Sequence, residues 1–394
     1  MSAPLTLSAK EAAAELGVSL ATLYAYVSRG LIRSEATAGG RTRLYRAEDV
    51  RALVARRDRP DAAAGEKALD WGAPVLESAI TLITGGGLYY RGRDATDLAA
   101  GATLETVAGL LWEVTADPFA DEPPDLPPAL GLPPGLDPLD RLLSLLPLAA
   151  AADRRAVNRT PAGLARTGAR ILRLTAAILA DTAPSTLPLH QVLCRAWGVT
   201  GPAAELLRAA LVLCADHELN ASAFTVRCVA STGASPYASL SAGIGALRGP
   251  RHGGMTARVA ALVPGLLDTP DPAAALSALL ARGEELPGFG HPLYPDGDVR
   301  ATWLLKRMAA TWGGDARLRR AMTLARAATD LAGTPPTIDF ALVLLADRLG
   351  LPPHAPLCLF TLGRSAGWMA HYLEQARSTT LIRPRARYTG LRPG

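Results

Sequence analysis

Three histidines in polar, glycine-rich surroundings are the side chains of this sequence best suited to chemistry. They are His217 in the string Asp-His-Glu, His252 in Arg-His-Gly-Gly and His291 in Gly-Phe-Gly-His. Imidazole can donate or accept a proton near neutral pH, and neighbouring glycines let the backbone bend close to another molecule. Three such histidines within 75 residues, with Arg300 nine positions after the last, favour a polar small-molecule site over three separate core histidines.

The strings around these histidines, with two later strings, resemble the citrate synthase family. In family order, the matching strings are Asp216-His217-Glu218, Gly249-Pro250 with His252-Gly253-Gly254, Gly288-Phe289-Gly290-His291 with Asp298-Val299-Arg300, Thr337-Ile338-Asp339-Phe340, and Ile382-Arg383-Pro384-Arg385. Each string alone carries little information, but five in the same order over about 170 residues form a specific signal. The resemblance implies an all-α, two-domain citrate synthase fold.

The resemblance also implies a reaction, the condensation of acetyl-CoA with oxaloacetate and water to citrate and CoA through an enol or enolate. Such a reaction needs a base at the thioester methyl group and hydrogen-bond donors at the two carbonyl oxygens. The family match gives these roles to Asp339 as the base, His252 at the thioester and His291 at the ketone. Asp339 begins an apolar helical segment, where burial should raise its pKa. A helix cap is the other interpretation, although Thr337 could provide that cap equally well.

Arginines are the expected partners of the two oxaloacetate carboxylates, because a guanidinium group binds a carboxylate at two points. The family match assigns Arg300, Arg364 and Arg383 to this role, with His217 assisting. In relatives the arginine matching Arg383 reaches the site of the neighbouring subunit. The resemblance therefore implies a homodimer with Arg383 contributed across the interface.

Coenzyme A is expected to cross the loop at residues 286–290, where Gly288, Phe289 and Gly290 would contact it. Acetyl-CoA is then a co-substrate, and no permanently bound cofactor is expected. No metal-binding triad is evident in the sequence. Arg282 and Arg248 are candidates for the CoA phosphates, but no motif assigns them.

The sequence departs from the family pattern at three positions near these strings. Met255 and Thr256 stand where the family usually has Ala-Asn, and Val299 stands where it usually has Pro. Neither departure removes a reacting group. The extended N-terminal β-rich region of the NADH-regulated hexameric enzymes is also missing, so that regulation is not expected.

The composition favours packed helices as the scaffold for these residues. Of the 394 residues 49% are hydrophobic and only 5% are aromatic, with Ala and Leu dominant. Strands are enriched in β-branched and aromatic residues, so an all-α body is predicted. The length suggests two or three folding units.

We predict the following domains. A small helix-turn-helix domain occupies residues 1–58 and a linker residues 59–67. A large citrate synthase domain takes residues 68–253 and 353–394, and a small domain residues 254–352. The active site is expected between the large and small domains, which would close on oxaloacetate.

The first 58 residues read as a DNA-binding head. Ser8 and Glu11 form a capping-box pattern before one short helix, Gly17 ends it, and Ser19 can cap a second helix. The basic string at residues 41–46 predicts a hairpin or wing. This block resembles the heads of the MerR and excisionase-like families, and the net charge of residues 1–60 is +4, against +1 for the rest. A protein-interaction module, or a relic head without a DNA site, is the alternative.

Other segments are assigned from local pattern. Residues 80–92 predict a strand pair whose glycines at 85–87 form a tight turn rather than a phosphate cradle. Residues 117–140, rich in proline and acidic side chains, predict a surface loop. Helices are predicted at residues 48–57, at 104–112 as the first of the body, and at 141–151, 164–180, 203–215 and 236–247, the last capped by Ser235.

The cysteines and the N-terminus indicate a reducing cytoplasm. The four cysteines lack Cys-x-x-Cys spacing and lie in apolar strings, which favours buried thiols over disulfides or metal ligands. No secretory signal is apparent. Residues 228–247 carry no charge, but their Ser, Thr, Gly and Pro content predicts a buried segment and no membrane partner.

Two other functions stay open at the sequence level. A 2-methylcitrate synthase would use propionyl-CoA, and one methylene changes selectivity by only about 1–3 kcal/mol, too little to read from sequence. A DNA-binding regulator could instead sense oxaloacetate or acyl-CoA with an enzyme-like body. The presence of Asp339, His252 and His291 favours activity, because a sensor needs the binding arginines but no base.

Overall fold

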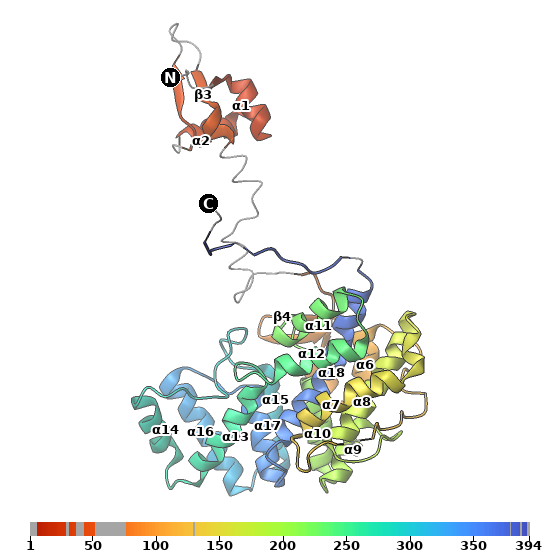
Figure 1. The fold of residues 1–394 in the computed structure, drawn as a ribbon. Coiled ribbons are helices and arrows are strands. Elements are labelled where there is room, and N and C mark those ends of the chain that lie inside the picture. Colours follow the sequence, from red (N-terminus) through yellow and green to blue (C-terminus); the bar gives the residue numbers. More distant parts are fainter. Residues whose placement is uncertain are drawn as a thin grey trace. The chain divides into compact units, whose positions relative to one another are not determined.

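The computed structural model describes residues 6–28, 31–36, 43–51, 76–128, 131–378, 380–386 and 388–391. The chain divides into two compact units, Met1–Glu77 and Ser78–Gly394, and most of the described residues are helical (Figure 1). No helix in these ranges is both long enough and apolar enough to cross a membrane.

The first unit contains two short helices, α1 (Ala9–Leu16) and α2 (Leu20–Ser28). The hydroxyl of Ser8 accepts from the Glu11 backbone while the Glu11 carboxylate accepts from the Ser8 backbone, so the predicted capping box is present. Gly17, with φ 63°, ends α1 in the left-handed conformation. The Ser19 hydroxyl accepts from the backbone of Thr22 in the first turn of α2.

A three-stranded antiparallel sheet completes this unit, in the order β1-β3-β2. Its strands are β1 (Thr6–Leu7), β2 (Ser34–Ala36) and β3 (Arg43–Arg46), and the described part of the basic string, residues 43–46, pairs antiparallel with β2, as in the predicted hairpin. The tip of that hairpin and the predicted linker at residues 59–67 lie outside the described residues. The predicted helix at 48–57 is helical as far as residue 51, beyond which it also lies outside them. The small core contains Leu16, Leu23, Ile32, Tyr45 and Val50.

The second unit opens with a hairpin and two short helices. Strands β4 (Thr81–Thr84), β5 (Gly87–Tyr90) and β6 (Arg93–Asp94) form an antiparallel sheet, and Gly85 and Gly86 at φ 54° and 75° make the predicted tight turn. Helix α5 (Ala95–Gly101) precedes α6 (Leu104–Trp112). The prediction that 104–112 is the first helix of the body was therefore wrong, because the Asp94 side chain caps a short helix with little apolar periodicity.

The remaining elements are helical, and capping residues fix several of their starts. The side chains of Asp137, Thr160 and Ser235 each accept a backbone N–H directly before a helix that begins with proline. The loop predicted at residues 117–140 therefore ends at Asp137, where α7 begins. The elements are α7 (Pro138–Ala152), η1 (Arg154–Val157), α8 (Pro161–Leu179), α9 (Leu189–Ala196), α10 (Pro202–Leu213), α11 (Ala221–Ser231), α12 (Pro236–Leu247), α13 (Gly254–Asp268), α14 (Pro272–Ala281), α15 (Val299–Trp312), α16 (Ala316–Ala332), α17 (Ile338–Leu349) and α18 (Ala355–Ala376).

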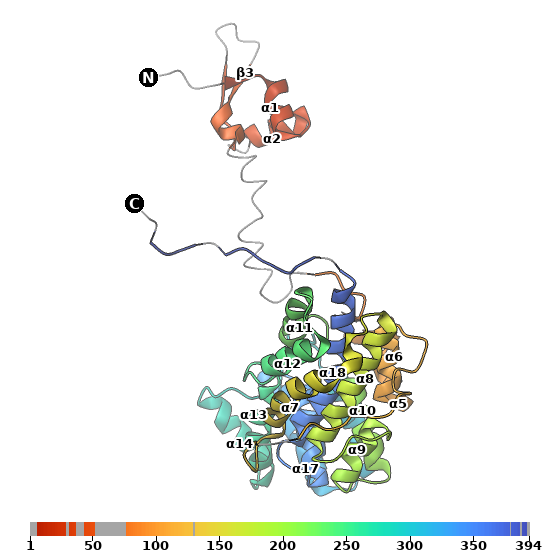
Figure 2. The same ribbon diagram turned by 45° about the vertical axis from the view of Figure 1, so that its right-hand side comes forward.

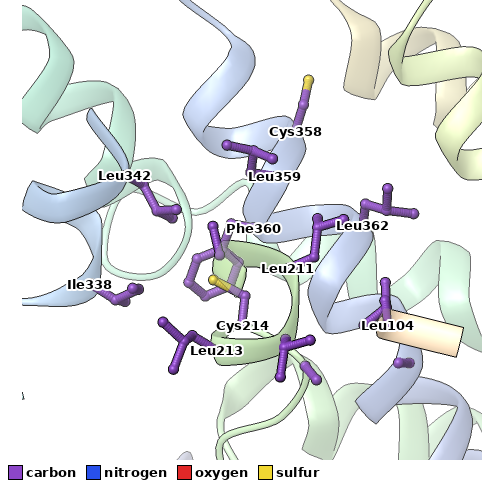
Figure 3. Packing of buried hydrophobic residues seen from close by; sticks show 14 of the residues in the cluster. Leu104, Leu211, Leu213, Cys214, Ile338, Leu342, Cys358, Leu359, Phe360 and Leu362 are labelled. Carbon is purple, nitrogen blue, oxygen red and sulfur yellow. The ribbon is translucent and has the colours of Figure 1, made fainter. Parts of the chain in front are cut away.

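Helix α18 forms the centre of the packing. It is buried on almost every side and contacts α6, α8, α10, α11 and α12. Figure 3 shows Phe360 and Leu362 of α18 among Leu211, Leu213 and Leu104 of α10 and α6. Most of the buried side chains of α18 are apolar, and such a helix can lie inside a bundle because every face meets another helix.

Helix α17 joins this bundle to a second helical group. It packs against α18 and also against α13, α15 and α16, while α14 packs on α16 (Figures 1 and 2). These helices fall within the stretch predicted as the small domain. The domain boundaries at 253/254 and 352/353 stay a prediction.

Two glycines of α18 let this helix approach the end of α10 backbone to backbone. A side chain at Gly367 would overlap the carbonyl oxygen of Ala215 and the carboxylate of Asp216, and one at Gly363 would lie 2.6 Å from the carbonyl oxygen of Leu211. The Gly367 N–H donates to the Ala215 carbonyl at 3.0 Å. This close approach sets α18 directly against the segment that leads to His217.

Candidate active site

His217, His291 and Tyr294 form a compact aromatic cluster. The His217 and His291 ring centroids lie 5.0 Å apart, and the Tyr294 ring lies 5.5 Å and 5.2 Å from them. The Tyr294 hydroxyl is 3.1 Å from Nε2 of His217. His217 lies in the turn between α10 and α11, whereas the other two lie in the loop between α14 and α15, so the fold joins two distant strings.

The glycine loop before His291 is docked on the segment that leads into α17. The carbonyl of Gly288 accepts from the backbone N–H of Thr337 at 2.9 Å and from its hydroxyl at 3.1 Å. Gly290 donates to the Pro335 carbonyl at 2.8 Å. Both glycines have positive φ, 84° and 75°, a conformation that other residues adopt only with strain.

Asp298 is a buried carboxylate that binds three different groups. It caps α15 by accepting the Arg300 N–H at 3.0 Å, and it pairs with the guanidinium of Arg300 through Nε at 2.9 Å and Nη2 at 2.8 Å. It also accepts the first N–H of α17, from Ile338, at 2.9 Å. Burial alone would raise the pKa of Asp298, but Arg300 and these backbone donors hold it below its usual value.

Arg364 is a nearly fully buried cation, 1% exposed, that forms no salt bridge in the described part of the chain, although the Asp216 carboxylate acts on it at longer range. Its Nε donates to the Cys214 carbonyl at 3.0 Å, and its guanidinium carbon lies 4.9 Å from the Phe360 ring centroid. Its Nη2 is buried and has no hydrogen-bond partner among the described residues. Because leaving a buried charged donor unsatisfied is costly, this nitrogen points to an anionic ligand.

His252 lies just before α13 and is held by Ser222. The distance from His252 Nε2 to the Ser222 hydroxyl is 2.7 Å. That hydroxyl also accepts from the indole of Trp368 at 3.0 Å and donates to the side-chain oxygen of Asn220 at 2.7 Å. The His252 ring meets Phe360 edge-on, at 6.3 Å between centroids. Nδ1 is thus the ring nitrogen left to face a ligand.

All three histidines are neutral at pH 7. Burial, followed by the charge of Arg364, lowers the pKa of His252 to about 4, and burial with Arg300 lowers that of His291 to about 4. Burial and both arginines lower the pKa of His217 well below its ordinary value. Nδ1 of His291 accepts the Leu293 N–H at 3.2 Å, so the neutral ring carries its proton on Nε2.

Asp339 is the second residue of α17 and is partly buried. Its Oδ1 accepts from the Thr256 hydroxyl at 2.5 Å. Burial raises the pKa of Asp339, while the Thr256 hydrogen bond and Arg300 act in the opposite direction. The cap interpretation is not needed, because Asp298 accepts the first N–H of α17 and the Thr337 hydroxyl serves Gly288 instead.

Some predicted residues lie apart from this cluster. Arg383 is exposed in the segment after α18 and does not approach the site within its own chain. The Phe289 ring is buried against Phe340, with centroids 4.9 Å apart, so only its backbone could face CoA. Arg282 pairs with Glu284 and Arg248 with Asp140, and their assignment to the CoA phosphates stays a prediction.

Four residues of the site have roles that sequence reasoning did not find, namely Ser222, Thr256, Tyr294 and Asp298. Except for the Asp298–Arg300 pair, the contacting residues are separated by 30 to 83 positions in the sequence. A local sequence pattern therefore carries no signal for these contacts. The one available signal was Asp298 two positions before Arg300, at a helix start. In the described ranges no three His, Cys, Asp or Glu side chains gather closely enough to hold a metal ion.

Comparisons with known protein families match both parts of the chain. A family model described as "Citrate synthase, C-terminal domain" matches residues 68–385, well over half of the chain. A second, described as "Helix-turn-helix domain", matches residues 6–58. These matches agree with the two resemblances seen in the sequence.

Individual relatives carry two different enzyme names. The "Putative citrate synthase 2" of Mycobacterium bovis is 40% identical over 196 residues, which are 48% of this chain and 52% of that protein. The chain thus spans about half the length of the first curated relatives that it matches. The 2-methylcitrate synthase of Shewanella oneidensis is 29% identical over 365 residues, 82% of this chain and 94% of that protein.

A solved structure supports the fold. The crystal structure of citrate synthase from Thermotoga maritima matches with a TM-score of 0.69 and 28% identity, over 81% of this chain and 94% of that one. The all-α, two-part architecture predicted from the sequence is therefore confirmed as a citrate synthase fold preceded by a helix-turn-helix region.

The variant Asp298→Asn tests how far the fold depends on this carboxylate. Asn can still cap α15, but it leaves the Arg300 charge buried without its partner, which should cost about 3–5 kcal/mol of unfolding free energy. Asp271→Asn is the matched control, because Asp271 caps α14 in the same way at an exposed position. Urea unfolding should show a loss below about 0.5 kcal/mol for the control. Equal losses in the two variants would contradict the role of Asp298.

Proposed function

This chain belongs to the citrate synthase family, and we propose that it condenses acetyl-CoA with oxaloacetate and water to form citrate and CoA. The observation that carries the proposal is the buried Nη2 of Arg364, which has no acceptor among the described residues and lies in a cluster with Arg300 and neutral histidines. A small dicarboxylate supplies the missing negative charge. A neutral ligand without an acceptor for Nη2 would leave that charged nitrogen unsatisfied.

Oxaloacetate is held by the two buried arginines. Asp298 occupies Nε and Nη2 of Arg300, so Nη1 is left for one substrate carboxylate. Arg364 offers Nη2 to the other, and charge-assisted bonds of this kind are the stronger class of hydrogen bond. His217 assists through Nδ1, because the Tyr294 hydroxyl already bonds its Nε2.

His291 polarises the ketone of oxaloacetate. Its Nδ1 accepts from the Leu293 backbone, which puts the proton of the neutral ring on Nε2, the nitrogen that would donate to the ketone oxygen. The lowered pKa keeps the ring neutral, so its N–H is a hydrogen-bond donor that adds no full charge beside Arg300. This donor stabilises the negative charge that develops on the oxygen as the carbon–carbon bond forms.

Asp339 and His252 act on the thioester. The Asp339 carboxylate takes a proton from the methyl group of acetyl-CoA, and the electrons of that C–H bond move to the thioester oxygen, where His252 donates through Nδ1. For Nδ1 to carry the proton, the Ser222 hydroxyl must turn its one proton from the Asn220 side-chain oxygen to Nε2 of His252. The enol carbon then attacks the ketone carbon, the ketone oxygen takes a proton, and water hydrolyses the resulting thioester to citrate and CoA.

Closure of a small domain, residues 254–352, on a large one would complete the site. His252 lies directly before the proposed boundary at residue 253, and Asp339 lies in the proposed small domain. Domain closure on oxaloacetate would therefore bring together the two side chains that act on the thioester. The glycine loop at residues 288–290 would then contact CoA. Such closure keeps water from the thioester until condensation, and binding is ordered with oxaloacetate first.

Arg383 would complete the site of a second copy of the chain. It is exposed in a segment that leaves the end of α18, and Ile382 is tied to the Ser231 hydroxyl at 3.1 Å. An exposed arginine on an extended segment can bind a carboxylate in a neighbouring subunit, and no salt bridge holds Arg383 among the described residues of its own chain. The active form is therefore a homodimer.

The first unit would bind DNA through α2. Leu20 and Tyr24 of this helix are 40% and 52% exposed, although large apolar and aromatic side chains usually lie inside. The unit has the order of a helix-turn-helix with a basic strand, and its excess charge is positive. In a homodimer two such helices would favour a palindromic site.

The acyl-CoA substrate is tested by comparing kcat/KM for acetyl-CoA and propionyl-CoA at saturating oxaloacetate. We expect acetyl-CoA to be preferred by roughly tenfold or more, because one methylene is worth about 1–3 kcal/mol in a fitted pocket. Asp339→Asn is the control, and it should abolish turnover while oxaloacetate still binds. A preference for propionyl-CoA would instead make the chain a 2-methylcitrate synthase, and a variant with a tenth of the wild-type kcat would remove Asp339 as the base.

The anion site is tested by calorimetry of oxaloacetate binding to Arg364→Leu. Loss of this guanidinium should weaken the Kd by roughly 100-fold or more, since one carboxylate loses its charged partner. Arg307→Leu removes an exposed arginine from α15, the helix of Arg300, and should leave the Kd within about twofold. Similar affinities for both variants and the wild type would exclude Arg364 from the site.

DNA binding is tested by selecting genomic fragments with the full chain at near-physiological salt. The selected site should be palindromic, and affinity should fall steeply as salt rises. Tyr24→Ala should lower affinity at least tenfold, whereas Leu82→Ala, an equally exposed residue of the second unit, should not change it. If no sequence is enriched, the first unit is a protein-interaction module.

A further inference from the structure

Thr256 of α13 donates a hydrogen bond to Asp339, the proposed catalytic base. It lies in the first turn of α13, is 1% exposed, and donates its hydroxyl proton to Oδ1 of Asp339 at 2.5 Å. The two residues are 83 positions apart in the sequence, on helices that pack against each other. A hydrogen bond to an ionised carboxylate belongs to the stronger class, so this contact restrains the proposed base.

We propose that Thr256 positions the carboxylate of Asp339, so that Oδ1 is held by the hydroxyl and Oδ2 is left to take the proton from the substrate. This inference rests on the proposed function. An aspartate carboxylate that no hydrogen bond holds can rotate about the Cβ–Cγ bond, and this rotation would exchange the two oxygens. A single fixed donor at Oδ1 removes that freedom before the substrate binds.

The donor is itself well fixed. Threonine is branched at Cβ, so its hydroxyl has few orientations in a helix, and Thr256 is buried between α13 and its neighbours. Gly253, at the start of the same turn, has no room for a side chain because Leu247 lies against it. The turn that carries Thr256 therefore has little freedom to move away from Asp339.

The same contact should also affect the protonation of Asp339. The charged groups that act on this carboxyl are Arg300, which favours the ionised form, and Asp298, which opposes it, both at the start of α15. Cys214, at the end of α10, faces Asp339 and Arg364 of α18 as a neutral thiol whose pKa burial raises to about 12. Burial raises the pKa of Asp339. The Thr256 hydroxyl acts in the opposite direction, because its hydrogen bond favours the ionised form that a base requires.

Thr256 stands at the position where the resembling family usually has asparagine. Asparagine also carries a hydrogen-bond donor, on its amide nitrogen. The departure therefore changes the side chain but can keep the donor. Thr256→Asn is accordingly expected to retain activity, whereas a variant without a donor is not.

The test compares Thr256→Val, which has nearly the same shape but no hydroxyl, with Thr256→Ser, which keeps the hydroxyl. At pH 7 the valine variant should lose about tenfold in kcat with an unchanged KM for oxaloacetate. The acidic limb of its kcat profile should move to higher pH by about one unit, because the ionised base has lost a donor. The serine variant should stay within about twofold of the wild type with an unshifted profile.

A second readout does not need turnover. Carbon-13 NMR of labelled aspartate carboxyls, with the Asp339 signal identified by its absence in Asp339→Asn, follows the titration of this carboxyl in the full chain. Its midpoint should be higher in Thr256→Val than in the wild type and unchanged in Thr256→Ser. If the wild type fails to condense acyl-CoA, the proposed function fails, while this titration still decides whether Thr256 holds the carboxyl.

The proposal is overturned if Thr256→Val matches the wild type in kcat, pH profile and carboxyl titration. It is also overturned if the serine and valine variants lose activity equally, since the hydroxyl would then be irrelevant. Should Thr256→Val fail to fold, Thr256→Cys takes its place, because a thiol is a much weaker donor of similar size. That variant should show the same shift of the acidic limb.

Discussion

The site depends on the hydrogen bonds of one buried carboxylate, that of Asp298. It neutralises Arg300, caps α15 and accepts the first N–H of α17, so two helices and one cation share a single anion. A buried charge is stable only when it is paired and fully hydrogen-bonded, and here the pairing also sets the geometry. Because Asp339 follows Ile338 directly, the same carboxylate determines where the proposed base can lie.

The second constraint is the close approach of α18 to the end of α10. Gly367 lies against the backbone of Ala215, which brings the buried cation of Arg364 beside the turn that carries His217. Two positive charges in a dry environment make protonated histidine unfavourable, so His217, His252 and His291 stay neutral. The site thus combines fixed cations for an anionic substrate with uncharged donors for carbonyl oxygens, a division of labour that suits acyl condensation.

Local patterns in the sequence predicted what depends on neighbouring residues. The capping box at Ser8, the cap at Ser235 and the turn at Gly85 are present because each is decided within a few positions. The histidines and Arg300 and Arg364 were found through motifs, and the structure brings them together. The roles of Tyr294 and Thr256 were not predictable, because their partners come from other helices. Helix α5 was missed because its short sequence has no apolar period, and Arg383 lies exposed after α18 in its own chain.

A crystal structure of the protein with oxaloacetate bound tests the central claim most directly, namely that the buried cations form a dicarboxylate site beside a ketone donor. The account predicts one carboxylate on Nη2 of Arg364, the other on Nη1 of Arg300, and the ketone oxygen within hydrogen-bond distance of Nε2 of His291. Oxaloacetate bound elsewhere, or Arg364 left unoccupied at saturating ligand, would contradict it.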